Sequence, residues 1–397
     1  MRRLPTLDVW ALRGRAVVRD PDEAHRAATP LELFFDLVFV VGVGRAAEAL
    51  RDELLAGHVV HGLFAFTAVF VAIWWGWMNY TWFASAHDSD DVAHRLLTFV
   101  QMTGALVLAS GVARAVEHDD YVVTTLGFLI MRIGLVWSWL RVARDCPDQR
   151  VRALRYSVGL SVLQVLWIMR LALPPAGSIA AFIVLGIGEL TVPYWAEHAS
   201  GSALFHPSHV EERYGLFTLI VLGESVLAAT TGFQSALDLG GLTVGLFAVG
   251  AGGLLIAFAC WWIYFDHPGH LTPTSEQAFR WGYAHVFVFA ALAALGAGLH
   301  VAADALGGHV DERVAALAVA VPAAGYLVGL CFVMAMTGTR VLSVRILPKL
   351  VAAAFLVVVG LLAPPTANVV AAATLLGLLA AAMVVTGAVR PAHVAHS

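Results

Sequence analysis

Residues 57–83 read GHVVHGLFAFTAVFVAIWWGWMNYTWF and contain no acidic or basic side chain other than histidine. A helix needs about 20 mostly apolar residues to cross the hydrocarbon core of a bilayer. This stretch is long enough, so it predicts a membrane-spanning helix. The other stretches that predict spans are 31–50, 93–113, 121–142, 152–173, 177–196, 211–232, 240–265, 280–303, 312–337, 346–363 and 367–389. We therefore expect an all-α integral membrane protein with about twelve transmembrane helices.

The composition supports this class and excludes others. Hydrophobic residues make up 59% of the 397 residues, charged residues 13%, and the net charge is −4. Soluble domains carry about 25% charged residues, so an ordinary soluble enzyme is excluded. A disordered chain would be far less hydrophobic, and a nucleic-acid binder would carry a basic patch. The expected partner is the lipid bilayer, and no nucleic acid is expected.

Arginine-rich segments predict the orientation of the chain. Residues 1–28 are rich in arginine and lack the apolar core of a signal peptide. Residues 141–155 and 340–349 are also basic. Cytoplasmic segments of membrane proteins carry an excess of Lys and Arg, so we expect these segments, and both termini, on the cytoplasmic side.

Two aromatic clusters indicate an internal repeat. Trp77 and Tyr80 match Trp261 and Tyr264 at the same offset along the chain. This offset spans six predicted helices, so the two copies would have the same orientation, as in transporters with parallel repeats. We expect two parallel six-helix repeats at 29–200 and 201–390, followed by a short cytoplasmic tail at 391–397.

The first predicted span begins TPLELFFDLVFV and carries Glu32 and Asp36 on one helix face, because they are four residues apart. A helix start favours a carboxylate for its dipole, with Thr29 as the cap. That interpretation suits Glu32. Asp36 lies one turn deeper, and ionisable side chains within a membrane are functional by default. Asp36 is therefore a candidate for binding a cation or relaying protons.

The segment HPSHVEERYGLFTLIVLGES at 206–225 carries a second set of candidates. Glu212 and Arg213 predict an ion pair near a helix start. His206 and His209 are weaker candidates for metal ligands, but no third histidine completes a zinc signature, so no metal site is predicted. Glu224 lies eleven residues, or about 16 Å, beyond Arg213. It is the strongest single candidate for contact with an ion, proton or solute.

Other polar residues lie inside the predicted spans. Arg132 needs a carboxylate partner, which could be Asp36, Glu189 or Glu224. His285 titrates near neutral pH in its unperturbed state, although a lone helix histidine is more often a packed one. The cysteines Cys146, Cys260 and Cys331 show no metal or disulfide spacing. No nucleotide or covalent-catalysis motif occurs, and no cofactor is expected.

Three blocks of this sequence resemble the bacterial low temperature requirement A family. They are TPLELFFDLVFVV at 29–41, WWGWMNYTWF at 74–83 and HVEERYGLFTLIVLGESV at 209–226. The resemblance implies a multi-pass protein of the bacterial inner membrane that is linked to growth in the cold. It implies no catalytic residues.

The leading hypothesis is a transporter or channel that passes an ion, proton or small solute along the interior of the bundle. Asp36 and Glu224 would be its carboxylates. The further pathway candidates are Glu32, Arg132, Glu212, Arg213 and His285. Two alternatives remain open: a membrane enzyme acting on lipid, with its nucleophile or metal in 87–95 or 198–213, and a non-catalytic scaffold or sensor. The sequence also leaves open a homo-oligomer.

Overall fold

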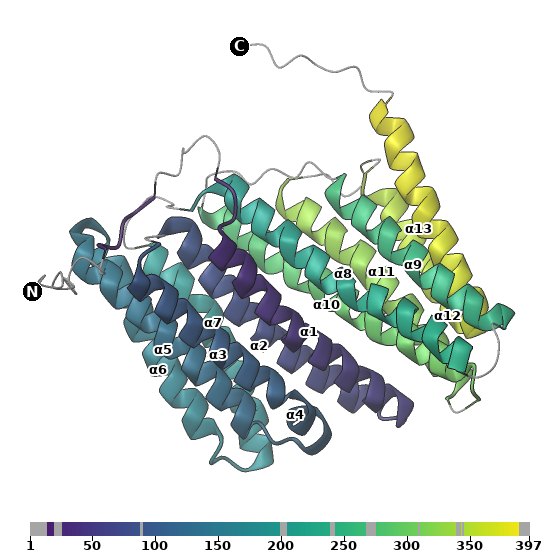
Figure 1. Ribbon diagram of the computed structural model, residues 1–397, viewed down its shortest axis with the longest axis horizontal. Coiled ribbons are helices and arrows are strands. Elements are labelled where there is room, and N and C mark those ends of the chain that lie inside the picture. The colour runs from purple at the N-terminus through teal and green to yellow at the C-terminus, as the bar shows by residue number, and fades with distance from the viewer. Residues whose placement is uncertain are drawn as a thin grey trace, which may run out of the picture. The chain divides into compact units, whose positions relative to one another are not determined.

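The computed structural model describes residues 14–19, 26–87, 90–198, 205–238, 243–266, 275–308, 310–338, 343 and 345–388. Within these ranges the regular secondary structure is helical and no strand is formed (Figure 1). The helices are α1 (Pro30–Leu55), α2 (Val59–Ala86), α3 (Val92–Ser110), α4 (Val112–His118), α5 (Val122–Asp145), η1 (Pro147–Gln149), α6 (Arg150–Arg170), α7 (Pro175–Glu197), α8 (Pro207–Asp238), α9 (Val244–Phe265), α10 (Ser275–Ala305), α11 (Glu312–Met336), α12 (Leu347–Leu362) and α13 (Pro365–Ala388). The prediction of an all-α protein is confirmed.

Ten helical segments within the described residues are long and apolar enough to cross a membrane. They confirm a membrane protein with multiple spans. α1 and α12 fall outside this set, because α1 carries several charges and α12 has 16 residues, about 24 Å at 1.5 Å per residue. A total of twelve spans therefore stays a prediction, as does the orientation of the termini.

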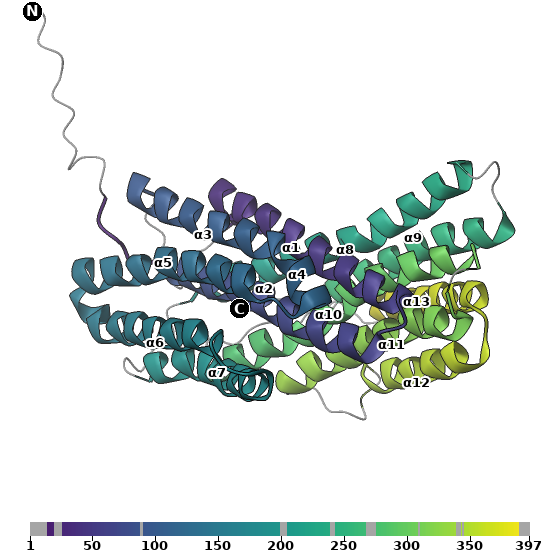
Figure 2. The same ribbon diagram turned by 90° about the horizontal axis from the view of Figure 1, so that it is seen from below.

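Contacts divide the chain into two compact units. The first comprises Met1–Arg45, Ala72–Arg213 and Thr272–Ser275, and the second comprises Ala46–Val71, Tyr214–Leu271 and Glu276–Ser397. In the first unit α5 packs against α3 and α6, and α7 packs against α6 (Figure 1). In the second unit α12 and α13 pack against α11, and α9 packs against α13 (Figure 2).

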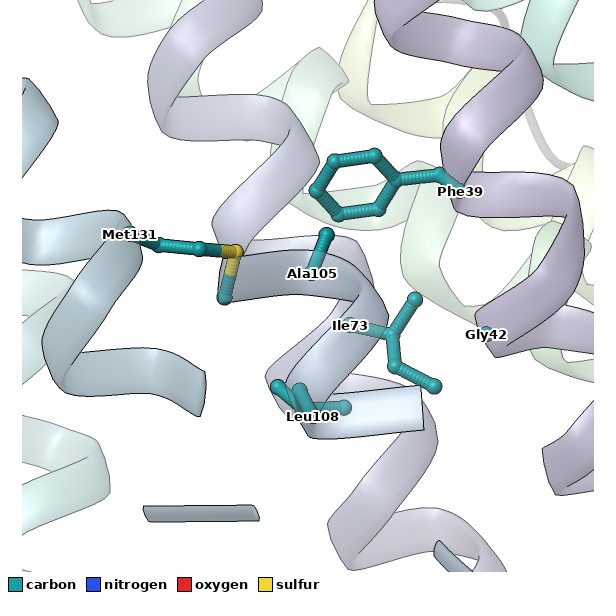
Figure 3. A pocket seen from close by; sticks show the side chains of 6 residues that line it. All are labelled: Phe39, Gly42, Ile73, Ala105, Leu108 and Met131. Carbon is teal, nitrogen blue, oxygen red and sulfur yellow. The ribbon is translucent and has the colours of Figure 1, made fainter. Parts of the chain in front are cut away.

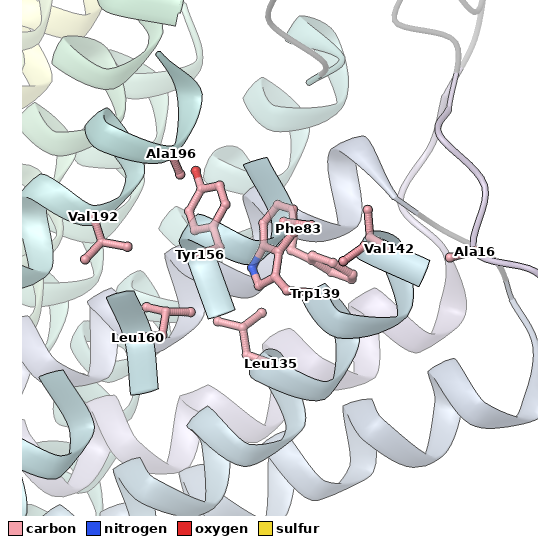
Figure 4. Packing of buried hydrophobic residues seen from close by; sticks show 11 residues of the cluster. Ala16, Phe83, Leu135, Trp139, Val142, Tyr156, Leu160, Val192 and Ala196 are labelled. Atoms are coloured by element: carbon pink, nitrogen blue, oxygen red, sulfur yellow. The ribbon is translucent and has the colours of Figure 1, made fainter. Parts of the chain in front are cut away.

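The core of the first unit contains a cluster of buried aromatic and aliphatic side chains, most of them from α5, α6 and α7 (Figure 4). Trp139 and Tyr156 stack with ring centroids 4.1 Å apart and an interplanar angle of 5°. Leu135, Leu160 and Val192 continue the same cluster. These apolar contacts set the register of the three helices, which positions the polar residues on either side of the cluster.

The positions that suggested the repeat have different surroundings. Trp77 is fully buried, whereas its counterpart Trp261 is 45% exposed. The ordering of neighbours is similar, since α6 packs against α5 and α7 while α12 packs against α11 and α13. The two-repeat layout and its boundaries stay a prediction.

Candidate functional site

The first turn of α1 is closed by a capping box. The Thr29 hydroxyl accepts a hydrogen bond from the Glu32 amide at 3.2 Å, and Glu32 Oε2 accepts one from the Thr29 amide at 2.8 Å. Ser/Thr followed by Glu three residues later is the usual sequence for this arrangement. Pro30 occupies the first helical position, where its missing N–H costs nothing. The local sequence therefore orients Glu32 at the helix start.

Glu32 also contacts α8. Its Oε1 lies 3.1 Å from His209 Nε2 and 3.1 Å from Arg213 Nη1. His209 and Arg213 are four residues apart and share one face of α8. All three side chains are buried. One carboxylate thus serves the helix cap and also contacts an arginine and a histidine of a distant helix.

Asp36 forms a buried, bidentate ion pair with Arg213. Arg213 Nε donates to Oδ2 at 3.0 Å and Nη2 donates to Oδ1 at 2.6 Å. The indole N–H of Trp77 donates to Oδ1 at 2.7 Å. Charge-assisted bidentate pairs are among the strongest hydrogen-bonded contacts in proteins. Asp36 is 2% exposed, and Arg213 and Trp77 are fully buried, so this pair is shielded from solvent in the structure.

A second buried ion pair lies in the same unit. Arg132 Nη2 donates to Glu189 Oε2 at 2.5 Å. Trp75 also donates to Oε2, at 2.9 Å, and Trp167 donates to Oε1 at 3.2 Å. Among the three partners that the sequence left open for Arg132, the structure selects Glu189.

Helix α2 supplies an indole to each ion pair. Trp75 binds Glu189 and Trp77 binds Asp36. Two residues along a helix are separated by about 200° of rotation, so the two indoles leave α2 on nearly opposite sides. The sequence analysis did not assign these tryptophans to the site. The sequence did hold a signal for this role. Both tryptophans lie inside a predicted span, and a buried indole N–H needs a hydrogen-bond acceptor.

Glu224 belongs to the second unit and differs from the other buried acids. It is 9% exposed, and within the described residues it has no hydrogen bond or ion pair; the charged side chain that acts on it is another acid, Glu48. α10 passes close by, since a Cβ at Gly296 would lie 2.8 Å from Glu224 Cβ. The adjacent Ser225 hydroxyl is fully buried and has no hydrogen-bond partner in the part of the chain that the structure describes.

The remaining sequence candidates lie apart from these pairs. Glu212 is exposed and accepts a hydrogen bond from the Ala28 amide at 3.2 Å. His206 Nδ1 lies 3.1 Å from the Ser208 hydroxyl and 3.3 Å from the His209 amide. Within the described ranges no three His, Cys, Asp or Glu side chains are grouped to hold a metal ion.

His285 lies in an aromatic environment in the second unit. Its ring is buried, and Nδ1 lies 2.8 Å from the Trp281 carbonyl oxygen one turn earlier in α10. The rings of Tyr214 and Trp281 are in contact with it, with centroids 5.1 Å and 4.1 Å away. A neutral imidazole that donates to this carbonyl satisfies the geometry without a carboxylate.

One apolar pocket lies near Asp36 along α1. It is lined by Phe39, Gly42, Ile73, Ala105, Leu108 and Met131 and has no room for a water molecule (Figure 3). All six side chains are apolar, so this pocket offers no hydrogen bond to an ion or a polar solute. The polar candidates of the first unit are the ion pairs themselves.

Comparison with known proteins places the chain in a family. The family described as Bacterial low temperature requirement A protein (LtrA) matches residues 27–387. The chain belongs to the LtrA family. The matched region contains both buried ion pairs and Glu224.

This LtrA-family chain is also similar to an uncharacterized protein of Rhizobium meliloti (strain 1021). The two are 28% identical over 260 residues, which cover 63% of this chain and 61% of the relative. The chain thus spans about three fifths of the length of the curated relative that it matches. The resemblance noted in the sequence is confirmed.

Proposed function

We propose that this LtrA-family protein moves an ion, proton or small solute across the bacterial inner membrane and that Asp36 and Glu224 are the carboxylates that carry it. The observation that supports the proposal most is Glu224. A charged carboxylate at membrane depth is costly unless it is paired or hydrated. Glu224 has no cationic partner among the described residues, so it favours a proton or a cation as its partner.

Asp36 takes the role of a switchable acid in this proposal. Arg213 contacts Asp36 through Nε and Nη2 and contacts Glu32 through Nη1 at 3.1 Å. When a proton or cation neutralises Asp36, Arg213 keeps Glu32 as its counter-ion. Losing one partner of a buried pair is costly when it leaves an uncompensated charge. The second carboxylate lowers that cost and so supports exchange at Asp36.

The test is flux in proteoliposomes. Wild-type protein is reconstituted with a dye inside that responds to the ion under test, and proton, sodium and potassium gradients are imposed in turn. We expect Asp36→Asn and Glu224→Gln each to reduce the flux to that of protein-free liposomes while the purified variants stay folded. Glu276→Gln is the matched control, because Glu276 is exposed and paired with Arg280 on the same helix, and it should keep wild-type flux.

Two results would overturn the proposal. Flux that persists in both Asp36→Asn and Glu224→Gln would show that these carboxylates do not carry the ion. Wild-type protein that passes none of the three ions would overturn the ion and proton forms of the proposal. The scaffold or sensor hypothesis expects the double variant Asp36→Asn, Arg213→Met to be tolerated, because removing both partners of a buried pair leaves no unpaired charge.

A further inference from the structure

One helical turn beyond the apolar cluster of the first unit, three helices each carry a polar side chain. On α5 Arg132 lies three residues before Leu135, and on α7 Glu189 lies three residues before Val192. On α6, which runs in the opposite direction, Gln164 lies four residues after Leu160 (the apolar layer is shown in Figure 4). Three or four residues make about one turn, so these side chains occupy one layer.

Contacts between α6 and α7 support this register. A Cβ at Gly188 would lie 3.0 Å from the Leu163 side chain, and Trp167 donates to Glu189 at 3.2 Å. Leu163 and Trp167 flank Gln164 on either side along α6. Gln164 is therefore level with Glu189, and the Arg132–Glu189 ion pair ties α5 to the same level.

The hydrogen-bonding capacity of this layer is not used up. Gln164 is 4% exposed, and neither its Nε2 nor its Oε1 has a partner within the described residues. Arg132 is 3% exposed, and its Nε is also buried without a partner. Buried polar side chains nearly always have a protein or water partner. The layer thus offers two kinds of donor and one acceptor that the described residues do not satisfy.

We infer that Arg132, Gln164 and Glu189 line a binding site for a small uncharged hydroxyl ligand, and that this ligand is water. The ligand must accept from Arg132 Nε and Gln164 Nε2 and donate to Gln164 Oε1, and a hydroxyl group does both. A charged ligand is disfavoured, because Glu189 already balances Arg132. Water bridging two to four buried polar groups is common in protein interiors.

This site is independent of the proposed function. It uses none of the contacts of Asp36 or Glu224 and requires no flux. The proposed water lies beside the Arg132–Glu189 ion pair of the first unit. Trp75 and Trp167 donate hydrogen bonds to Glu189 and so are oxidisable side chains at the edge of the proposed site.

Hydroxyl-radical footprinting of the full chain in nanodiscs tests the site directly. Radicals generated from a bound water oxidise neighbouring side chains, so in ¹⁸O-labelled water we expect ¹⁸O to enter Trp75, which is 3% exposed and donates to Glu189. Trp77 is the matched control, because it is also buried and its indole N–H is bonded to Asp36. If Trp75 gains no more label than Trp77, the site is dry and the inference fails.

Thermal stability gives a second readout. If water occupies the site, Gln164→Met removes its anchor, lowers the unfolding temperature and abolishes the ¹⁸O label. If the site is empty, the same change deletes two unsatisfied groups and raises the unfolding temperature, which would overturn the inference. Gln101→Met is the control, since Gln101 bonds weakly to the Leu97 carbonyl of its own helix at 3.5 Å. The wild-type footprint remains decisive if Gln164→Met does not fold.

Discussion

Asp36 and Glu189 show how single side chains are accommodated inside this protein. Each buried carboxylate accepts hydrogen bonds from one arginine and from at least one tryptophan. Their arginines differ in one respect. Arg213 has a second carboxylate, Glu32, at 3.1 Å, whereas Glu189 is the acid that pairs with Arg132 within the described residues.

This difference predicts an order of stability for two neutral substitutions. Glu189→Gln leaves Arg132 as an uncompensated buried charge, which costs about 3–5 kcal/mol of unfolding free energy. Asp36→Asn costs less, because Arg213 keeps Glu32. Unfolding midpoints in detergent micelles measure both variants. An equal loss, or a larger loss for Asp36→Asn, would contradict the assigned pairing.

His87 is a second residue whose surroundings have a measurable consequence. It follows the last residue of α2, is 3% exposed, and has no partner for either ring nitrogen among the described residues. Its ring contacts Phe83 and Trp139. Burial, together with the nearby positive charge of Arg152, lowers the pKa of His87 from 6.5 to about 3.

The lowered pKa of His87 predicts how stability changes with pH. Below pH 6.5 the unfolded chain binds a proton at this position, whereas the folded chain stays neutral down to about pH 3. The contribution of His87 to the free energy of unfolding is therefore fully present above pH 6.5 and is lost as the pH falls toward 3. His87→Phe, which keeps an aromatic ring, should flatten the dependence of the unfolding free energy on pH in this window. Identical slopes in wild type and variant would contradict the prediction.

At the scale of whole elements, close helix packing in the first unit depends on glycine. A Cβ at Gly104 of α3 would lie 2.5 Å from the Met131 backbone nitrogen and 2.6 Å from the Gly127 carbonyl oxygen of α5. Small residues allow such close approach between membrane helices. The backbones of α3 and α5 therefore meet without side chains between them. This close contact fixes the register of α5, and with it Arg132, against α3.

Gly104→Ala should separate α3 from α5 and destabilise the protein by about 1–3 kcal/mol, the usual cost of overpacking. Gly186→Ala is the matched control on α7, where a Cβ would meet nothing within 4 Å. There alanine should be neutral or stabilising by up to about 1 kcal/mol through its helix propensity. Thermal unfolding in detergent compares the two. The packing assignment fails if the two alanines have the same effect.

Helix α2 is the element that the sequence explained least. Its apolar run predicted a span correctly, but the run WWGW was interpreted as an aromatic cluster and a repeat marker. The structure uses two of its indoles as hydrogen-bond donors to acids on α1 and α7. The rotation of α2 decides which tryptophan reaches which acid, and hydropathy carries no information about rotation.

At the scale of the whole chain, composition and hydropathy were sufficient for the class of protein. The apolar runs coincide with the long helices, and family membership covers residues 27–387. α1 and α12 depart from the simple rule for a span, α1 through its charges and α12 through its short length. The inner-membrane location, the cytoplasmic termini and the repeat stay predictions.

The candidate site was predictable in its members but only partly in its arrangement. Asp36 was singled out from its charge at membrane depth, whereas Glu32 was assigned to the helix start and Arg213 to an ion pair with Glu212. The structure instead pairs Arg213 with Asp36 and Glu32 and places His209 beside Glu32. Arg132 was singled out with three partners open. Glu212 is exposed, and His285 faces aromatic rings and a backbone carbonyl. Trp75 and Trp77 were not assigned to the ion pairs, because hydropathy does not show which acid an indole N–H reaches.

The helices, their apolar runs and the depth of the charged residues follow from the sequence alone, because helix formation and partition into hydrocarbon depend on neighbouring residues along the chain. The pairing of the charges does not follow from it. Asp36 and Arg213 are 177 residues apart, and their contact depends on the rotation and register of two helices packed against each other. Those are set by side-chain packing across the unit, which becomes defined only when the distant helices come together.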